Sequence, residues 1–145
     1  MTAAMPLQTG SGILVQGLKV LVCDDDPELA LAVKSLLERR FGFKRISVTY
    51  DGTLAIGELQ LAVDRGVYFD MVICDWNMPR CTGLELLQWM RSRASLAATP
   101  FVFLTAVAEE HMVRAAIAIG ASDYVMKPLS EAVFTRKIGA LIEKL

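Results

Sequence analysis

The sequence is poor in the residues that cross-link a small domain. Among 145 residues there are three cysteines and one histidine, and no two cysteines form a Cys-x-x-Cys pair. An odd number of cysteines without metal-ligand spacing argues against a disulfide framework and against a zinc site. Cys23 and Cys74 each lie in a run of Val, Leu and Ile, so we expect reduced thiols that pack as small apolar groups. We interpret Cys81 as an ordinary loop residue rather than as a redox switch.

The chain also lacks an excess of charge of either sign. Its 15 Lys and Arg residues balance 16 Asp and Glu residues, and no predicted element carries the basic face of a nucleic-acid-binding protein. Apolar residues make up 54% of the chain, but charged residues interrupt every window long enough to span a bilayer. The first 17 residues have no charged side chain and lack the basic region and apolar core of a secretory signal. We therefore expect a cytoplasmic protein that binds neither nucleic acid nor membranes.

The length predicts one domain, because a chain of this size buries about two thirds of its unfolded surface in a single core. We expect residues 1–17 to form a flexible arm and residues 18–145 to form the domain. Within it, β-branched runs alternate with segments whose apolar residues recur at helical spacing. The predicted strands are residues 18–23, 45–49, 69–74, 100–104 and 122–126. The predicted helices run over residues 27–41, 52–64, 84–93 and 109–119, and from residue 130 to the C-terminus.

This alternation predicts the fold class. Five strand and helix units with nearly continuous apolar strands are typical of a parallel sheet that helices cover on both faces. The expected architecture is an α/β fold, a doubly wound (βα)5 three-layer sandwich with the strand order 2-1-3-4-5. Such sheets bind ligands beyond the carboxyl ends of the strands, at the point between strands one and three where the order reverses.

Three carboxylates fall at that point. Asp24 and Asp25 follow the first predicted strand, and Asp75 follows the third. Mg²⁺ prefers hard oxygen ligands, usually one or two carboxylates together with water and phosphate oxygens, so these residues predict a magnesium-dependent phosphate site. Asp26 precedes Pro27, and we interpret it as the N-cap of the following helix instead.

Four motifs in a fixed order carry a resemblance to a known family. The chain from Leu18 onward resembles the receiver domain of two-component response regulators, close to the stand-alone CheY-like type. The motifs are Asp24-Asp25, Asp75-Trp76-Asn77-Met78-Pro79 with Gly83-Leu84-Glu85-Leu86-Leu87 after it, Thr105-Ala106, and Tyr124-Val125-Met126-Lys127-Pro128.

The resemblance implies the chemistry of the acidic residues. Asp75 would accept a phosphoryl group from a phosphohistidine on a histidine kinase or a histidine phosphotransfer protein. Mg²⁺ would be held by Asp24, Asp25, Asp75 and the backbone carbonyl of Asn77. The protein would then be a signalling phosphoacceptor rather than an enzyme, catalysing only its own phosphorylation and dephosphorylation.

The same resemblance assigns the remaining site residues. Lys127 would contact the phosphoryl oxygens as a point charge, and Thr105 would donate its hydroxyl to one of them. Tyr124 would shift when Thr105 moves, altering the face formed by the fourth helix, the fifth strand and the last helix. That face would bind a downstream target or form a weak phosphorylation-dependent dimer, and the protein would otherwise be a monomer.

Two positions bear on how long the phosphoryl group persists. In this family, the residues two past the phosphoacceptor and two past the threonine flank the path of the hydrolytic water. Here they are Asn77 and Val107. A valine cannot orient water by hydrogen bonding, so we expect the phosphoryl group to last longer than it would with a polar residue at position 107.

Other functions remain open. A phosphatase of the haloacid dehalogenase type also combines a nucleophilic Asp, a Lys and acidic magnesium ligands. It needs a second Asp two residues past the nucleophile as general acid, where this chain has Asn77. A pseudo-receiver that binds partners without phosphorylation would not need the complete set of acid, threonine and lysine. The sequence could also be a fragment of a larger regulator or of a hybrid kinase.

Overall fold

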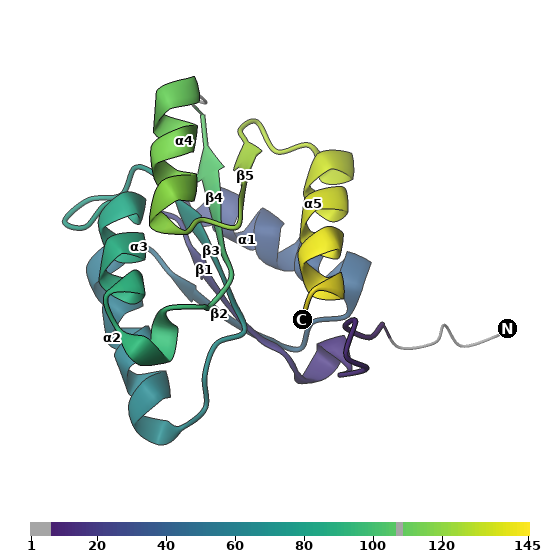
Figure 1. The fold of residues 1–145 in the computed structure, drawn as a ribbon. Helices are drawn as coiled ribbons and strands as arrows, with labels where there is room; N and C mark the ends of the chain where they lie inside the picture. Colours follow the sequence, from purple (N-terminus) through teal and green to yellow (C-terminus); the bar gives the residue numbers. More distant parts are fainter. Residues whose placement is uncertain (1–6, 107–108) are drawn as a thin grey trace, which may run out of the picture.

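The sheet has the predicted order. The computed structural model describes residues 7–106 and 109–145, which contain a five-stranded sheet ordered β2-β1-β3-β4-β5 with every neighbouring pair parallel (Figure 1). The strands are β1 (Lys19–Cys23), β2 (Arg45–Thr49), β3 (Met71–Asp75), β4 (Phe101–Thr105) and β5 (Asp123–Met126). The α/β doubly wound prediction is therefore confirmed.

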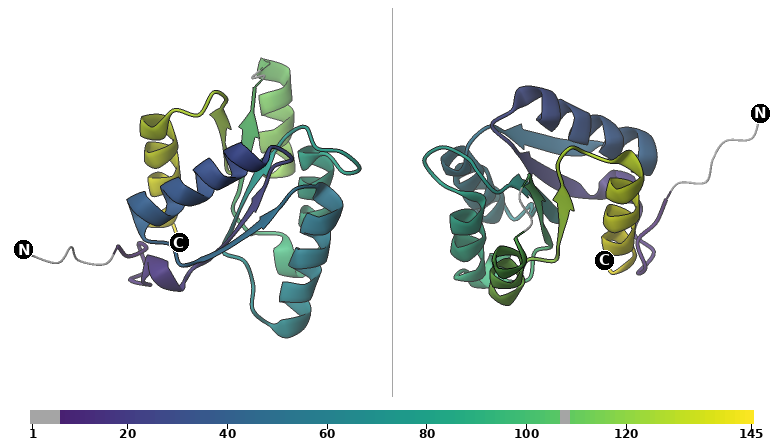
Figure 2. Two further views of the ribbon diagram at one scale, coloured as in Figure 1. Left: turned by 180° about the vertical axis from the view of Figure 1, so that it is seen from behind. Right: turned by 90° about the horizontal axis from the view of Figure 1, so that it is seen from above.

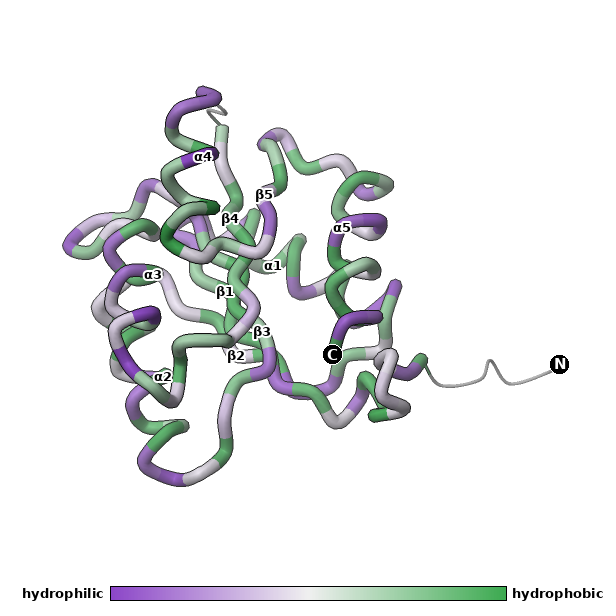
Figure 3. Tube along the Cα trace, in the orientation of Figure 1, coloured by the Kyte–Doolittle hydropathy of each residue, from purple (hydrophilic) through white to green (hydrophobic). Residues whose placement is uncertain are grey.

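Helices cover both faces of the sheet, as apolar side chains on alternate sides of each strand require. On one face, residues such as Val22 and Ile73 pack with α1 and α5. On the other face, residues such as Cys23 and Phe103 pack with α2, α3 and α4. Figure 2 shows the two helical layers from behind and from above, and Figure 3 shows that the strands between them are mostly hydrophobic.

Four of the described α-helices begin where a side chain caps free backbone N–H groups. The α-helices are α1 (Pro27–Leu36), α2 (Gly52–Arg65), α3 (Gly83–Arg91), α4 (Glu110–Ile119) and α5 (Glu131–Glu143). The capping side chains are those of Asp26, Asp51, Thr82 and Ser130, which precede α1, α2, α3 and α5. The first helix was expected to reach Phe41. It does so through a π-helical turn, η2 (Leu37–Phe41), and ends at Gly42 with φ 81°.

Two strands end one residue later than expected, and both ends matter for the site. Asp75 and Thr105 are the last residues of β3 and β4. The ladder extends because Trp76 N–H donates to the Leu104 carbonyl and Lys127 N–H donates to the Thr105 carbonyl. Both side chains therefore project from hydrogen-bonded strand ends rather than from loops.

Part of the predicted arm packs against the domain. Gln8 and Leu14 form an isolated bridge, and Val15 in the short helix η1 (Val15–Gly17) is buried. The backbone N–H and hydroxyl of Ser11 donate to the Leu145 carbonyl at 3.1 and 2.9 Å. Residues 7–17 thus lie beside the end of α5 (Figure 1), and the division of the chain at residue 17 stays a prediction. Among the described residues, no helix is both long and apolar enough to cross a bilayer.

Candidate functional site

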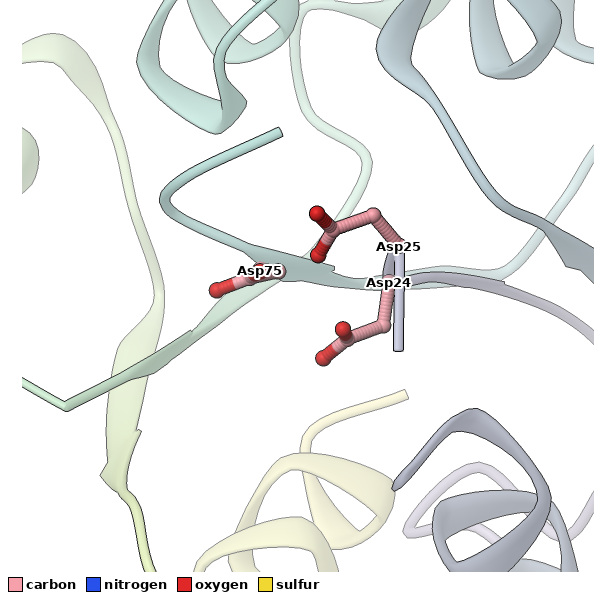
Figure 4. A group of neighbouring side chains, drawn as sticks. All are labelled: Asp24, Asp25 and Asp75. Carbon is pink, nitrogen blue, oxygen red and sulfur yellow. The ribbon is translucent and has the colours of Figure 1, made fainter. Parts of the chain in front are cut away.

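An acidic cluster lies at the carboxyl edge of the sheet. Cys23 on β1 pairs with Cys74 on β3, so the residues that follow them, Asp24 and Asp75, emerge side by side. Asp25 adds a third carboxylate. One carboxylate oxygen from each of the three aspartates lies within 4.8 Å of the others. Figure 4 shows the three side chains as neighbours at the ends of their strands. The predicted convergence of Asp24, Asp25 and Asp75 is therefore present in the structure.

The three carboxylates differ in burial. Asp24 is 0% exposed and Asp75 is 5% exposed, whereas Asp25 is exposed. Asp24 Oδ1 accepts a hydrogen bond from the backbone N–H of Asp26 at 2.9 Å. Asp26 itself accepts from Glu28 and Leu29 at the start of α1, as its predicted capping role requires. Two carboxylates are thus fixed and shielded, and the third faces solvent.

Lys127 supplies the positive charge of the site. It lies one residue beyond β5, and its Nζ is 3.2 Å from Asp24 Oδ2 and 3.1 Å from Asp75 Oδ1. Because both partners are buried, these ion pairs are less screened by solvent than pairs on the protein surface. The ammonium therefore holds two carboxylates that would otherwise repel each other.

Burial and mutual repulsion shift the acids toward their neutral forms. Burial, followed by the charge of Asp24, raises the pKa of Asp75 to about 6, although Lys127 and the backbone N–H of Asn77 oppose the shift. Burial likewise raises the pKa of Asp24. Burial lowers the pKa of Lys127, but hydrogen bonds and charges from Asp75 and Asp24 outweigh it, so the net shift is upward. At neutral pH Asp75 is therefore mostly ionised.

Thr105 and Tyr124 connect this cluster to the α4 side of the sheet. Thr105 is 4% exposed, and its carbonyl accepts from Lys127 N–H at 2.7 Å. It also lines a small apolar pocket beneath α4, together with Tyr124, Trp76 and Met112. Trp76 directly follows Asp75, so the pocket adjoins both the acidic cluster and β5.

The loop from β3 to α3 is fastened to the start of α2, which the sequence did not reveal. Arg80 has φ 69° and its Nη1 lies 3.4 Å from Asp51 Oδ2, while the other oxygen of Asp51 caps α2. A Cβ at Gly52 would overlap the Cβ and the carbonyl of Cys81. Only a glycine fits there, so the loop that carries Asn77 sits directly on α2.

Thr82 caps the start of α3. Its hydroxyl accepts from Glu85 N–H at 3.1 Å, and Glu85 Oε1 accepts from Thr82 N–H at 3.2 Å. This reciprocal capping box gives Thr82 a structural role outside the acidic cluster.

The donor set fits a hard divalent cation. Three carboxylates converge, and within the part of the chain that the structure describes the buried Asp24 Oδ2 has no hydrogen bond of good geometry, although it forms an ion pair with Lys127. A buried carboxylate oxygen without a good hydrogen bond is suited to bind a cation. The backbone N–H of Asn77 points to the Asp75 carboxylate, and the predicted role of its carbonyl stays a prediction. Val107 lies outside the described residues, so its predicted effect on hydrolysis also stays a prediction.

Comparison with known proteins finds similarity over most of the chain. The family model described as "Response regulator receiver domain" matches residues 20–139. Chemotaxis protein CheY-3 of Vibrio cholerae is 32% identical over 133 residues, which cover 92% of this chain and 98% of the relative. Chemotaxis protein CheY of Pseudomonas aeruginosa is 33% identical over 128 residues, covering 88% of this chain and 98% of the relative.

A solved structure shows the same fold. The chemotaxis response regulator CheY4 of Vibrio cholerae superimposes with a TM-score of 0.75 at 27% identity, covering 86% of this chain and 98% of that one. The residues that the family model matches, 20–139, include β2 to β5, all of β1 except Lys19, and the acidic cluster.

Proposed function

The chain belongs to the response regulator receiver family, and on that premise we propose that Asp75 accepts a phosphoryl group from a phosphohistidine and thereby alters a protein-binding face. The observation that carries the proposal is the position of Lys127, whose ammonium lies between the buried carboxylates of Asp24 and Asp75. A cation in this place can neutralise an incoming phosphoryl group.

Asp75 acts as the nucleophile. Its carboxylate oxygen forms a bond to phosphorus while the bond from phosphorus to the histidine nitrogen breaks, and that nitrogen keeps the electron pair. A pKa of about 6 leaves the carboxylate mostly ionised at neutral pH. The ion pair with Lys127 and the hydrogen bond from Asn77 hold the Asp75 carboxylate in place, which favours in-line attack.

Asp24 and Asp25 would hold Mg²⁺ together with Asp75 and the Asn77 carbonyl. When bound, the ion supplies positive charge that offsets the crowded carboxylates and the phosphoryl oxygens. Lys127 can turn from Asp24 toward a phosphoryl oxygen without leaving Asp75, because it contacts both. Thr105, at the end of the adjacent strand, would donate its hydroxyl to another phosphoryl oxygen.

The response would pass through Tyr124 to the face formed by α4, β5 and α5. The pocket beneath α4 is lined by both Thr105 and Tyr124, which supports a direct coupling between them. We propose a histidine kinase or phosphotransfer protein as donor and a protein target for this face. The named chemotaxis relatives favour a motility pathway. Membership of the receiver family favours this role over that of a haloacid dehalogenase-type phosphatase.

Phosphorylation by a small donor tests the proposal without knowledge of the kinase. The protein is incubated with acetyl phosphate and Mg²⁺, and its intact mass is measured. Wild type should gain one phosphoryl group, and addition of EDTA should prevent the gain. An Asp75→Asn variant that takes up phosphate as readily as wild type would refute the assignment.

A further inference from the structure

Charged side chains occupy the open edge of the sheet at Tyr124. Among the described strands β5 pairs with β4 alone, so it lies at the edge of the sheet. The backbone N–H of Tyr124 donates to Asp123 Oδ1 at 2.8 Å, and its carbonyl accepts from Lys137 Nζ at 2.6 Å. An edge strand otherwise leaves such groups to water or to another strand. Asp123 and Lys137 therefore satisfy both polar backbone groups of one residue.

Lys137 also contacts the aromatic ring of Tyr124. Its Nζ lies 4.1 Å from the ring centroid and 3.4 Å from Asp123 Oδ1. The lysine side chain is only 20% exposed and that of Asp123 is 34% exposed, so solvent screens these contacts incompletely. One ammonium thus joins a carboxylate, a carbonyl and an aromatic face, which is more than a surface ion pair provides.

This contact crosses from one helical layer to the other. Lys137 belongs to α5, which covers the face of the sheet shared with α1. The Tyr124 ring packs on the opposite face and lines the apolar pocket beneath α4. In Figure 1, β5 lies between α4 and α5, so the lysine passes around the edge of the sheet.

From these contacts we infer that Lys137, held by Asp123, is a positioning residue that fixes the Tyr124 ring beside the pocket beneath α4. The inference rests on the proposed function, in which Tyr124 moves on phosphorylation. Movement of the ring then requires it to leave the Lys137 ammonium, so Lys137 opposes the phosphorylated arrangement. A group that stabilises one of two arrangements sets their relative populations.

A purely structural role is the alternative. In that case Lys137 would only close the edge of β5, and its loss would weaken the domain without changing the ring. The two roles separate in the rotamer population of Tyr124, which a loss of stability alone does not change.

The first experiment measures the χ1 rotamer of Tyr124 by NMR couplings in the unphosphorylated protein. Lys137→Met keeps most of the apolar stem and removes the cation, and it should change one dominant rotamer into an average of several. Lys137→Arg should restore the wild-type rotamer, because arginine also donates hydrogen bonds and stacks on aromatic rings. Asp123→Asn retains an acceptor for Tyr124 N–H and should have a smaller effect. A Tyr124 rotamer that is unchanged in Lys137→Met overturns the inference.

Lys144→Met is the matched control. Lys144 is an exposed lysine at the end of the same helix, seven residues and about 10 Å farther along it. The Lys144→Met variant should leave the Tyr124 rotamer unchanged. If Lys137→Met unfolds the domain, Lys137→Gln removes the charge and retains a hydrogen-bond donor on a side chain that is one bond shorter. The same rotamer criterion then decides the result.

The second experiment measures the rate of phosphorylation by acetyl phosphate at saturating Mg²⁺. Lys137→Met should react about three- to tenfold faster than wild type, as expected for the loss of one partly buried cation–π contact. An equal or slower rate contradicts the inferred opposition to phosphorylation. If wild type takes up no phosphate, the proposed function fails, whereas the NMR result still decides whether Lys137 positions Tyr124.

Discussion

The acidic cluster and the α4 side of the domain are built differently, although they share Thr105. Asp24 and Asp75 are buried and tied by Lys127 to each other. On α4, Ala116 is the only described residue that is fully buried, and Ile117 is 54% exposed. No side chain of the described residues caps the start of α4, whereas side chains cap the other four α-helices.

Under the proposed function, this difference separates the phosphoryl chemistry of the acidic cluster from the response of the α4 side. Phosphoryl transfer depends on fixed charges, and a buried network of ion pairs provides them. A helix with few buried contacts costs little to displace, as a switching surface requires. A receiver can therefore hold its nucleophile rigid while a neighbouring helix remains free to respond.

Removal of Lys127 should have the largest effect on the acidic cluster. Lys127→Met leaves two buried carboxylates without their cation, so phosphorylation by acetyl phosphate should slow by about 10²-fold or more. In EDTA at pH 8 the free energy of unfolding should fall by about 3 kcal/mol, as for a buried pair that loses one partner. Urea unfolding and intact mass measure the two effects.

Lys144→Met serves as the control for that prediction, because Lys144 is exposed at the end of α5. It should change neither quantity appreciably. Equal losses in both variants would mean that the charge between Asp24 and Asp75 is unimportant.

The acidic cluster should cost stability when no cation is bound. The folded-state pKa of Asp75 is about 6, above its ordinary value of 3.8. Between pH 3.8 and pH 6, the folded protein therefore holds a proton on Asp75 that the unfolded chain has lost. In EDTA the free energy of unfolding should therefore fall as pH rises from 4 to 6. Asp75→Asn removes this charge and should stabilise the protein at pH 7 by on the order of 1–3 kcal/mol.

Denaturant unfolding measures the free energy of unfolding of wild type and of Asp75→Asn across this pH range. The variant should show a weaker pH dependence, and the Asp24 carboxylate should account for part of what remains. A variant less stable than wild type at pH 7 in EDTA would contradict the electrostatic account.

The contact between α2 and the loop after β3 should have an intermediate effect. Gly52→Ala would push a Cβ into Cys81 and displace the loop that carries Asn77. The Mg²⁺ dissociation constant, followed by Trp76 fluorescence in a Trp89→Phe background, should rise about three- to tenfold, because metal ligands tolerate little misplacement.

Gly57→Ala is the matched control in the same helix. A Cβ at Gly57 would meet nothing within 4 Å, so this variant should leave the Mg²⁺ affinity unchanged. It should also stabilise α2 slightly, because alanine favours helix more than glycine does. Equal Mg²⁺ affinities for the two variants would show that the loop does not position the site.

The smallest effect on stability is expected on α4. Ile117→Ala should change the free energy of unfolding by less than about 0.5 kcal/mol, because the side chain is half exposed. Leu87→Ala in α3 removes a fully buried side chain and should cost about 2–5 kcal/mol. Thermal or urea unfolding compares the pair. A similar cost for both would remove the contrast between α4 and the rest of the fold.

Local patterns in the sequence were sufficient for the sheet and for the acidic residues. The alternation of apolar strands with amphipathic helices predicted the doubly wound sheet and its strand order. The positions of Asp24, Asp25 and Asp75 at strand ends predicted that their side chains converge. Asp26 was predicted as a helix cap from its neighbour Pro27, and its side chain has that role. These inferences succeed because the relevant interactions are short-range or follow from sheet geometry.

Contacts between distant residues left no such signal. The pairing of Arg80 with Asp51 depends on how a loop lies on α2, and the contact of Lys137 with Tyr124 depends on a side chain that passes around a sheet edge. Residues 7–17 lack charge and regular periodicity, yet they pack against the end of α5. Tertiary packing decides these features, and a periodic pattern does not encode them.

The most direct test of the account identifies the residue that carries the phosphoryl group. After reaction with acetyl phosphate and Mg²⁺, borohydride reduces an aspartyl phosphate to homoserine, and peptide mass spectrometry locates the change. The account predicts homoserine at position 75 alone. Homoserine at Asp24 or Asp25, or none at Asp75 in protein that has gained the mass of a phosphoryl group, would contradict it.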